Sequence, residues 1–353
     1  MLAMFSGLVT VTGILRFCLE NIYNLKILTK GLSCLASFSM VALKALMFFL
    51  YRQQIRELNF ILEPMFEEVL VKAQYQSVVL SILNLFRRPA YMIYYLTVGI
   101  LMLYTCSPLI LILYQVIKHV DPIRYGLPFP TSLPWIDGTP GVRYKVEYLF
   151  EIQVSWFAVF VTCSVDCAYG FYIFQMIGVL RAMSLDCEEL ARSPKELDVV
   201  IRNCVKKQTL LLRCRDIIQN VYGPVILGLI ISGSAVLCAL IFQMFETEIS
   251  VGKTLLFLVY GMMKMTQVFL YSWHGSIFAA ESEAFRRSIY CGEWYQHGDI
   301  ILMKDVLFVL TQKPIVLTAC HFVYVSLDIF VKILNTSMSC YFLLQTFDEI
   351  DKH

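Results

Sequence analysis

The sequence predicts an all-α, polytopic membrane protein with seven transmembrane helices. Three observations support this fold class. Hydrophobic residues make up 58% of the 353 residues and charged residues 16%, whereas a soluble domain is about half apolar and about a quarter charged. The mean hydropathy is +0.66. Seven apolar stretches are each long enough to cross a bilayer, which takes roughly 17–25 helical residues.

These stretches are expected to be helices because backbone polar groups find no water inside a bilayer. Strands of a membrane barrel would alternate apolar and polar residues, and these stretches do not. The chain also shows no internal repeat or linker, so we interpret residues 1–353 as a single domain. We expect spans at residues 1–19, 30–51, 91–117, 148–180, 221–245, 254–279 and 315–347.

The distribution of Lys and Arg predicts the orientation of the chain. The segments after the second, fourth and sixth spans hold 17 Lys and Arg residues, whereas the opposite side holds eight. Positively charged loops stay in the cytosol. We therefore expect a cytosolic N-terminus and an extracellular C-terminus, the reverse of a G-protein-coupled receptor.

The segments between the spans differ in kind. Residues 118–147, expected outside, are rich in Pro and Gly and predict an irregular lid with several turns. The cytosolic segments 181–220 and 280–314 carry apolar residues at helical spacing. We expect them to form a helical anchor that extends the spans into the cytosol, with a short helix near residues 299–310.

Several functions are excluded by what the sequence lacks. A net charge of +2 gives no argument for nucleic-acid binding. No nucleophile motif, phosphate-binding loop, dinucleotide fingerprint or metal-ligand spacing occurs, so we expect no enzyme, no cofactor and no metal site. His274 is interpreted as a satisfied packing residue. The twelve cysteines lie mostly in spans or cytosolic segments, which favours free thiols; a bridge between Cys18 and Cys34 is the minor alternative.

Ionisable residues inside predicted spans are candidates for function because burying a charge in a bilayer is costly. Lys44 and Asp166 are expected at similar depth and could pair. Lys264 could pair with an acid, which we favour, or meet a carbonyl or carboxylate ligand. Asp328 and Lys332 are four residues apart with the acid first, so they could form an ion pair on one helical face.

Two runs in the C-terminal third carry a family resemblance. The run VFLYSWHGSIFAAESEAFRRSIYCGEWY (268–295) is similar to the signature at the end of the sixth helix in the insect odorant receptor family. The run QKPIVLTACHFVYVSLDIFVKILNTSMSCYFLLQTF (312–347) is similar to its last helix, although Gln345 replaces an Arg of the family. The matching residues of the first run are Gly275, Glu281, Ser282, Ser288, Ile289, Tyr290 and Trp294.

The resemblance implies an odorant-gated, non-selective cation channel. Four subunits would surround one pore, with the olfactory co-receptor as the usual partner, in the dendritic plasma membrane of olfactory sensory neurons. The last helix would line the pore. There we expect Leu344 to close the pore as an apolar ring, and Gln345 and Thr346, next to Tyr341, to replace the hydration of cations.

The resemblance also implies an odorant pocket in the outer half of each subunit. Small volatile odorants need a mostly aliphatic and aromatic pocket with few polar groups. The positions that fit are Phe38, Val41, Tyr104, Ser107, Leu111, Phe150, Gln153, Val154, Phe157, Tyr260, Met263 and Lys264.

Two alternatives remain open at the sequence level. A gustatory receptor of the same superfamily would share the fold, but its usual C-terminal pattern is distorted at Tyr341 and at residues 345–347. A membrane transporter would belong to another class; it would show inverted repeats and broken helices. The sequence itself does not name the odorant.

Overall fold

The computed structural model describes residues 2–119, 125–131, 141–189, 194–246, 251–291 and 300–351. Helices account for most of these residues. The elements are α1 (Leu2–Glu20), α2 (Leu25–Leu50), α3 (Arg52–Val71), α4 (Ala73–Ile117), α5 (Val142–Glu189), α6 (Pro194–Glu246), α7 (Val251–Cys291), α8 (Ile300–Thr311), β1 (Thr318–Ala319), β2 (Val323–Tyr324) and α9 (Leu327–Asp351).

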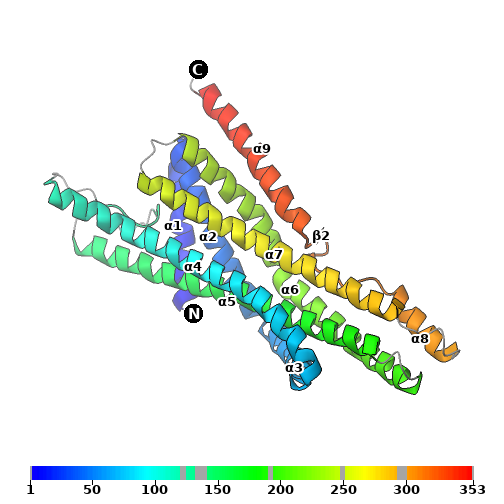
Figure 1. Cartoon of the computed structure of the whole chain (residues 1–353). Coiled ribbons are helices and arrows are strands. Elements are labelled where there is room, and N and C mark those ends of the chain that lie inside the picture. The colour runs from blue at the N-terminus through cyan, green and yellow to red at the C-terminus, as the bar shows by residue number, and fades with distance from the viewer. Residues whose placement is uncertain are drawn as a thin grey trace.

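The long helices α4, α5, α6 and α7 run lengthwise through the molecule (Figure 1). Helix α5 packs against α4 and α7, α2 packs against α6, and α1 packs against α2. Helix α9 contacts α6 and α7 and leaves the bundle at an angle, so the C-terminus lies apart from the other helices (Figure 1).

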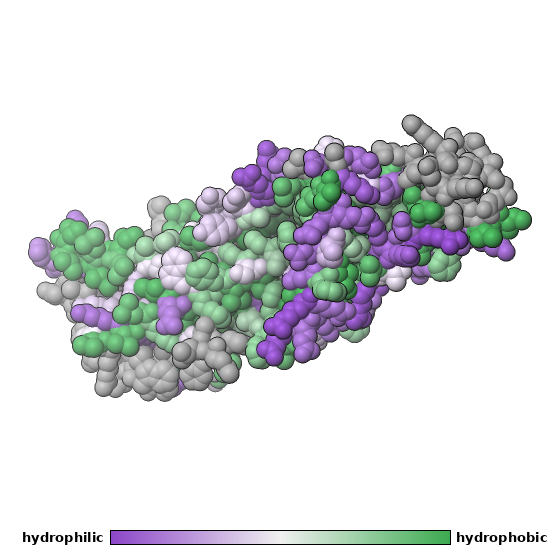
Figure 2. Space-filling view, turned by 90° about the horizontal axis from the view of Figure 1, so that it is seen from below, coloured by the Kyte–Doolittle hydropathy of each residue, from purple (hydrophilic) through white to green (hydrophobic). Residues whose placement is uncertain are grey.

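Five helices of the described chain, α2, α4, α5, α6 and α7, are long and apolar enough to cross a membrane. Four of these are much longer than a bilayer requires: α4 to α7 have 45, 48, 53 and 41 residues. One end of the molecule is mostly apolar on the face shown in Figure 2, whereas polar side chains gather toward the end that holds α3 and α8. The long helices therefore extend beyond the apolar zone, as the sequence predicts for a cytosolic anchor.

The predicted anchor segments are helical. Residues 181–189 and 194–220 continue α5 and α6, residues 280–291 continue α7, and α8 lies at Ile300–Thr311, where the short helix was predicted. Arg181 on α5 and Glu281 on α7 form an ion pair. This contact ties two anchor helices together through a residue of the signature run.

The prediction for the last span is wrong at its start. Residues 315–326 do not belong to the helix: β1 and β2 pair antiparallel there, and α9 begins at Leu327. His321 and Cys320 adopt positive φ angles of 63° and 50°, and the Phe322 amide donates to the Ala319 carbonyl at 3.0 Å. These angles are those of a tight hairpin turn. The apolar run is therefore split between a hairpin and a shorter helix.

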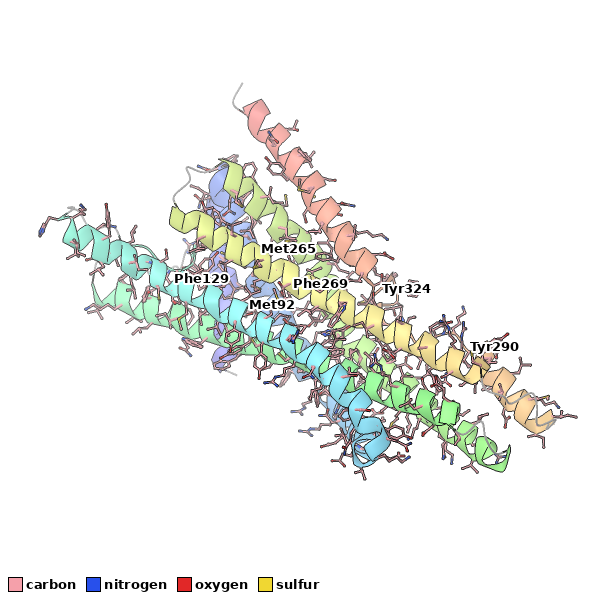
Figure 3. All side chains as sticks on the ribbon, viewed as in Figure 1. Met92, Phe129, Met265, Phe269, Tyr290 and Tyr324 are labelled. Carbon is pink, nitrogen blue, oxygen red and sulfur yellow. The ribbon has the colours of Figure 1, made fainter. Side chains whose placement is uncertain are left out.

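Three residues of α7 hold this hairpin. A Cβ atom on Gly275 would lie 2.3 Å from the Val325 carbonyl oxygen, so only glycine allows this approach. The Ser282 hydroxyl accepts a hydrogen bond from the Ile315 amide at 2.7 Å. The Ser276 hydroxyl accepts one from the first amide of α9, at Leu327, at 2.9 Å. Figure 3 shows Tyr324 of β2 where the hairpin meets α9.

Candidate ligand cavity and charge network

A cavity of about 110 Å³ lies between α2, α4, α5 and α7. We call it the first cavity. Its walls are mostly aliphatic and aromatic, which suits a small apolar ligand. The lining residues are Cys34, Ser37, Phe38, Met40, Val41, Lys44, Thr97, Ile100, Leu101, Tyr104, Phe129, Ser155, Ala158, Val159, Thr162, Leu229, Tyr260, Met263, Lys264 and Gln267.

Aromatic rings close one end of the first cavity. Phe129, from the loop after α4, lies 4.9 Å from the Phe38 ring in an edge-to-face contact and 5.5 Å from the Tyr104 ring (Figure 3). The carboxylate of Glu151 accepts hydrogen bonds from the Phe129 amide at 3.1 Å and the Thr131 hydroxyl at 2.6 Å. A buried carboxylate thus fixes the part of the predicted lid that reaches the cavity.

A second set of polar contacts crosses the cavity itself. The hydroxyls of Ser37 on α2 and Tyr260 on α7 form a hydrogen bond. The Lys264 ammonium lies 5.8 Å from the centre of the Tyr260 ring, a cation–π distance. These groups are the polar features with which a ligand could be oriented.

A buried charge network forms the other end of the first cavity. Lys44 and Asp166 form an ion pair at 2.6 Å, with both side chains 2% exposed. The Asp166 carboxylate also accepts hydrogen bonds from the Gln267 amide at 2.6 Å and the Tyr271 hydroxyl at 2.7 Å. Such additional donors are what a buried ion pair needs to offset its desolvation. The predicted pairing of Lys44 with Asp166 is confirmed.

Lys264 has no such partner within the described residues. It is 6% exposed, and no carboxylate oxygen of the described chain lies within 4.0 Å of its ammonium. The nearby acid, Asp166, is bound to Lys44. The ion pair that the sequence favoured for Lys264 is therefore not formed, which leaves the alternative of a ligand with a carbonyl or carboxylate.

The structure brings six of the twelve predicted ligand contacts together around the first cavity. These six residues come from α2, α4 and α7, which are far apart in sequence. The six residues are Phe38, Val41, Tyr104, Tyr260, Met263 and Lys264.

The other six predicted contacts lie elsewhere. Ser107, Leu111 and Gln153 are exposed on the outer faces of α4 and α5. Val154 and Phe157 line a separate cavity of about 340 Å³ between α1, α2 and α5, which we call the side cavity. Phe150 packs in the small core cluster beside it.

Sequence reasoning missed Phe129 and most of the α5 wall. Ser155, Ala158 and Val159 face the first cavity, and their small side chains give no sequence signal for a ligand site. The ligand contacts predicted on α5 lie on a helix face next to the one that lines the first cavity. Hydropathy could not separate these faces because it does not determine how a span is rotated about its axis. Phe129 lies between Pro128 and Pro130 in a loop for which no register could be predicted.

Helix α9 has one buried face and one exposed polar face. Ile329, Ile333, Ser337 and Tyr341 are buried and recur every four residues. The opposite face carries exposed polar residues at intervals of three, four and seven, which we call the polar stripe. It consists of Asp328, Lys332, Asn335, Ser339 and Thr346.

The predicted pore residues take different positions on α9. Thr346 is exposed, Gln345 is half-buried and Tyr341 is buried. The side chain of Leu344 lies outside the described residues. Asp328 and Lys332 share the exposed face, but no ion pair joins them in the described part of the chain. The twelve cysteines, Cys18 and Cys34 among them, are all free thiols.

An apolar cavity between the spans of a multi-span helical protein is a typical place for a small-molecule site. The fold and the first cavity define a multi-span membrane protein with a candidate small-molecule site. The family model described as 7tm Odorant receptor matches residues 24–338. The chain therefore belongs to the insect odorant receptor family, a family of multi-pass membrane proteins whose seven-span topology this fold fits.

Curated relatives are similar at low identity. Odorant receptor 82a of Drosophila melanogaster is 24% identical over 225 residues, which cover 63% of this chain and 58% of the relative. Odorant receptor 22c of Drosophila melanogaster is 27% identical over 263 residues, covering 69% and 63%. The chain thus spans about three fifths of the length of these relatives.

The fold is also that of a solved structure. The insect olfactory receptor OR5 from Machilis hrabei, in complex with eugenol, superposes with a TM-score of 0.85 at 15% identity. The match covers 98% of this chain and 88% of that receptor. At this identity the likeness establishes the fold alone.

Proposed function

We propose that the chain is the odorant-binding subunit of a heteromeric, odorant-gated cation channel in the dendritic plasma membrane of olfactory sensory neurons. The observation that carries this proposal is the first cavity, an apolar enclosure between four spans of an odorant receptor fold. The relatives that the chain matches are named odorant receptors. The matched solved receptor is in complex with eugenol, a small molecule.

The polar groups of the first cavity suggest the chemistry of the odorant. Tyr260 and Ser37 offer hydroxyls, and Lys264 offers a buried ammonium without an ion-pair partner in the described chain. A carbonyl or carboxylate oxygen would complete the hydrogen bonds of this ammonium, since an ammonium only donates. A volume of about 110 Å³ limits the ligand to a small molecule. We therefore infer a small ketone, ester, aldehyde or acid.

The polar stripe of α9 supports the pore. Polar residues at membrane depth normally face a protein interior or water, and the side chains of the stripe are exposed within the described part of the chain. The hydroxyls of Ser339 and Thr346 already donate to carbonyls one turn earlier, at 3.0 and 2.9 Å. Their oxygens can still accept, so they can face passing cations. Four copies of such a face, from this chain and its co-receptor, would form a hydrated path.

The anchor supports assembly with other subunits. Ile300, Leu307 and Phe308 of α8 are 60–68% exposed, and α8 lies at the end of the molecule that holds the anchor segments of α5 and α7 (Figure 1). Exposed apolar side chains of this kind mark protein contacts. We infer that α8 contacts a neighbouring subunit, with the olfactory co-receptor as the partner.

Whole-cell current recorded with a panel of small carbonyl odorants tests the proposal. The parent chain is expressed alone and with the co-receptor. The Tyr260→Ala variant of the chain is also expressed with the co-receptor, and Leu111→Ala, on the exposed face of α4, is the matched control. We expect cation current in co-expressing cells, a reduced response for Tyr260→Ala and a preserved one for Leu111→Ala. Absence of current despite confirmed surface expression would contradict the channel proposal.

A further inference from the structure

A second cavity, of about 550 Å³, lies between α4, α5 and α7. It is about five times as large as the first cavity. On α4, α5 and α7 the residues that line the second cavity lie closer to the anchor segments than the residues that line the first cavity. Its lining residues fall within 83–94 on α4, 166–174 on α5 and 270–274 on α7. Its volume falls in the range of about 300–1,000 Å³ that is typical of small-molecule sites.

Two buried polar atoms of this cavity lack partners. Tyr169 is 1% exposed and His274 is 6% exposed. Within the described residues, neither the Tyr169 hydroxyl nor His274 Nδ1 has a hydrogen-bond partner. Buried polar groups in proteins are nearly always hydrogen-bonded. His274 is therefore a packing residue, as predicted, but not a satisfied one.

Packing holds the two groups in place. The His274 ring stacks on Phe86, with the centroids 4.9 Å apart and the planes 7° from parallel. A Cβ atom on Gly170 would lie 3.0 Å from His274 Cε1, so the absence of a side chain there gives the imidazole its space. The Tyr169 and His274 rings are 5.7 Å apart. Packing thus fixes both rings beside the cavity before any ligand arrives.

The rim of the second cavity lies on the outer surface of the spans. Its rim residues Tyr91, Tyr94 and Phe171 are 49%, 48% and 54% exposed. They come from α4 and α5, the helices that flank the opening. Exposed tyrosine side chains at the end of a span are typical of the membrane interface, so we infer that an apolar molecule dissolved in lipid can enter between α4 and α5.

We propose that the second cavity binds a small, uncharged amphiphile with an apolar body and one hydroxyl or carbonyl group, which enters from the bilayer. Apart from Arg87 and Asp166, the lining is mostly aliphatic and aromatic and matches the apolar body. A hydroxyl could donate to one of the two unpartnered atoms and accept from the other, since a phenol and a neutral imidazole each do both. A lipid acyl chain would leave both atoms without partners, so the lining favours the amphiphile.

The two cavities share one carboxylate. Asp166 lines the second cavity, whereas its partners Lys44 and Gln267 line the first. An occupant of the second cavity therefore contacts the network that ends the first, so the two ligands are coupled in affinity. The binding proposal stands by itself, but its effect on current depends on the proposed channel function.

Photolabelling of the full-length chain in lipid nanodiscs, in complex with the co-receptor, tests the site. The probe is an eight-carbon alcohol that carries a diazirine, and the comparison probe is the matching alkane. Adducts are mapped by mass spectrometry in Tyr169→Phe and His274→Phe, which remove the two polar atoms and keep an aromatic ring at each position. Tyr172→Phe, also a buried tyrosine of α5 but outside the cavity lining, is the matched control.

We expect the alcohol to label residues within 83–94, 166–174 or 270–274. Each of the first two variants should lower this labelling about 2–10-fold, the effect of one hydrogen bond, while Tyr172→Phe and the alkane probe show no change. Equal labelling by both probes, unaffected by the variants, would assign the cavity to lipid chains and overturn the proposal. Absence of adducts in all three segments would also overturn it.

Labelling does not require current, so its outcome is independent of the channel function. In cells that give odorant current, the unlabelled alcohol should shift the half-maximal odorant concentration in the parent chain. The shift should be smaller in Tyr169→Phe. An unchanged concentration in cells whose channels are labelled would refute the coupling between the cavities.

Discussion

Asp166 is the centre of a buried charge network. One carboxylate accepts from Lys44, Gln267 and Tyr271. Each donor comes from a helix other than α5, so the network joins α2 and α7 to α5 at one point. The pairing could be predicted from sequence because ionisable residues in a bilayer must find partners. The two further donors could not, since Gln and Tyr are common in spans.

Removal of one member of the Lys44–Asp166 pair should be severe. Asp166→Asn leaves the Lys44 ammonium buried without a counter-charge, which typically costs about 3–5 kcal/mol. The double variant Lys44→Met/Asp166→Asn carries neither charge and should lose less than the two single variants combined. Thermal unfolding of the detergent-solubilised chain measures both.

The exposed ion pair between Arg213 and Glu57 provides the control for this cycle. Its side chains are 59% and 39% exposed, and such pairs contribute about 0–1 kcal/mol. Glu57→Gln should therefore change the stability little. If Asp166→Asn were as mild as Glu57→Gln, the network would not stabilise the fold as argued.

Lys264 should determine the chemical preference of the first cavity. Lys264→Met keeps the length of the side chain and removes the charged donor, whose hydrogen bond to a ligand is worth about 1.5–3 kcal/mol. The half-maximal concentration for carbonyl odorants should therefore rise roughly 10–100-fold, while that for alkanes or alkenes stays constant or falls. Concentration–response curves on co-expressing cells check this; a uniform shift for all odorants would argue against a direct contact.

At the scale of elements, the hairpin explains why glycine and serine occur in the signature run. Gly275 allows the approach of Val325, and Ser276 and Ser282 accept the amides at the two ends of the segment. Gly275 and Ser282 are among the residues that carry the family resemblance, so this part of the resemblance has a structural cause.

Substitution of Gly275 should disturb this contact. A methyl group there would lie 2.3 Å from a backbone carbonyl, which cannot move as a side chain can; overpacking of this kind costs about 1–3 kcal/mol. Gly275→Ala should lower thermal stability and surface expression. Gly261→Ala on the same helix places its methyl 3.8 Å from Leu240 and should be neutral or slightly stabilising. Equal behaviour of the two variants would contradict the close approach.

The polar stripe of α9 predicts a pattern of water access. In a Cys340→Ser background, cysteines at Asn335 and Ser339 should react with a charged, water-soluble thiol reagent applied during odorant stimulation and should reduce the current. Cysteine at Ser337, on the buried face, should react much more slowly. Equal rates at Ser337 and Ser339 would show that the stripe does not line the pore.

The extent of each element was partly predictable, and the reasons are physical. Hydropathy located the spans, because it depends on composition alone. It failed at residues 315–326, where Ile315, Leu317 and Ala319 are buried in alternation. That is the period of a strand. The residues between them, Val316 and Thr318, are not polar enough to reveal the period, and the run therefore resembles a continuous span.

The lining of the first cavity was predicted only in part for a related reason. Apolar residues occupy every face of a span, so periodicity does not identify the face that meets a cavity. On α7 the predicted Tyr260 and Met263 line the first cavity, whereas on α5 the predicted Val154 and Phe157 line the side cavity. The rotation of a helix about its axis depends on contacts with its neighbours, which a single sequence does not record.

At the scale of the whole molecule, the apolar residues of α8 should determine assembly. The double variant Leu307→Gln/Phe308→Gln removes two exposed apolar side chains and no buried one, so the fold of the chain should persist while its association with the co-receptor falls. Co-purification from co-expressing cells measures this. Phe60→Gln on α3, at a side chain that is 82% exposed, is the matched control. Unchanged co-purification in the double variant would place the subunit contact elsewhere.

The pinning of residues 315–326 to α7 has a mechanical consequence. Both amides at the ends of this segment bond to hydroxyls of one helix, and the same helix contributes Tyr260, Lys264 and Gln267 to the first cavity. A small rotation of α7 about its own axis would therefore move the start of α9. In the proposed channel, the single helix α7 would then connect the first cavity to the helix proposed to line the pore, without a chain of side-chain contacts between them.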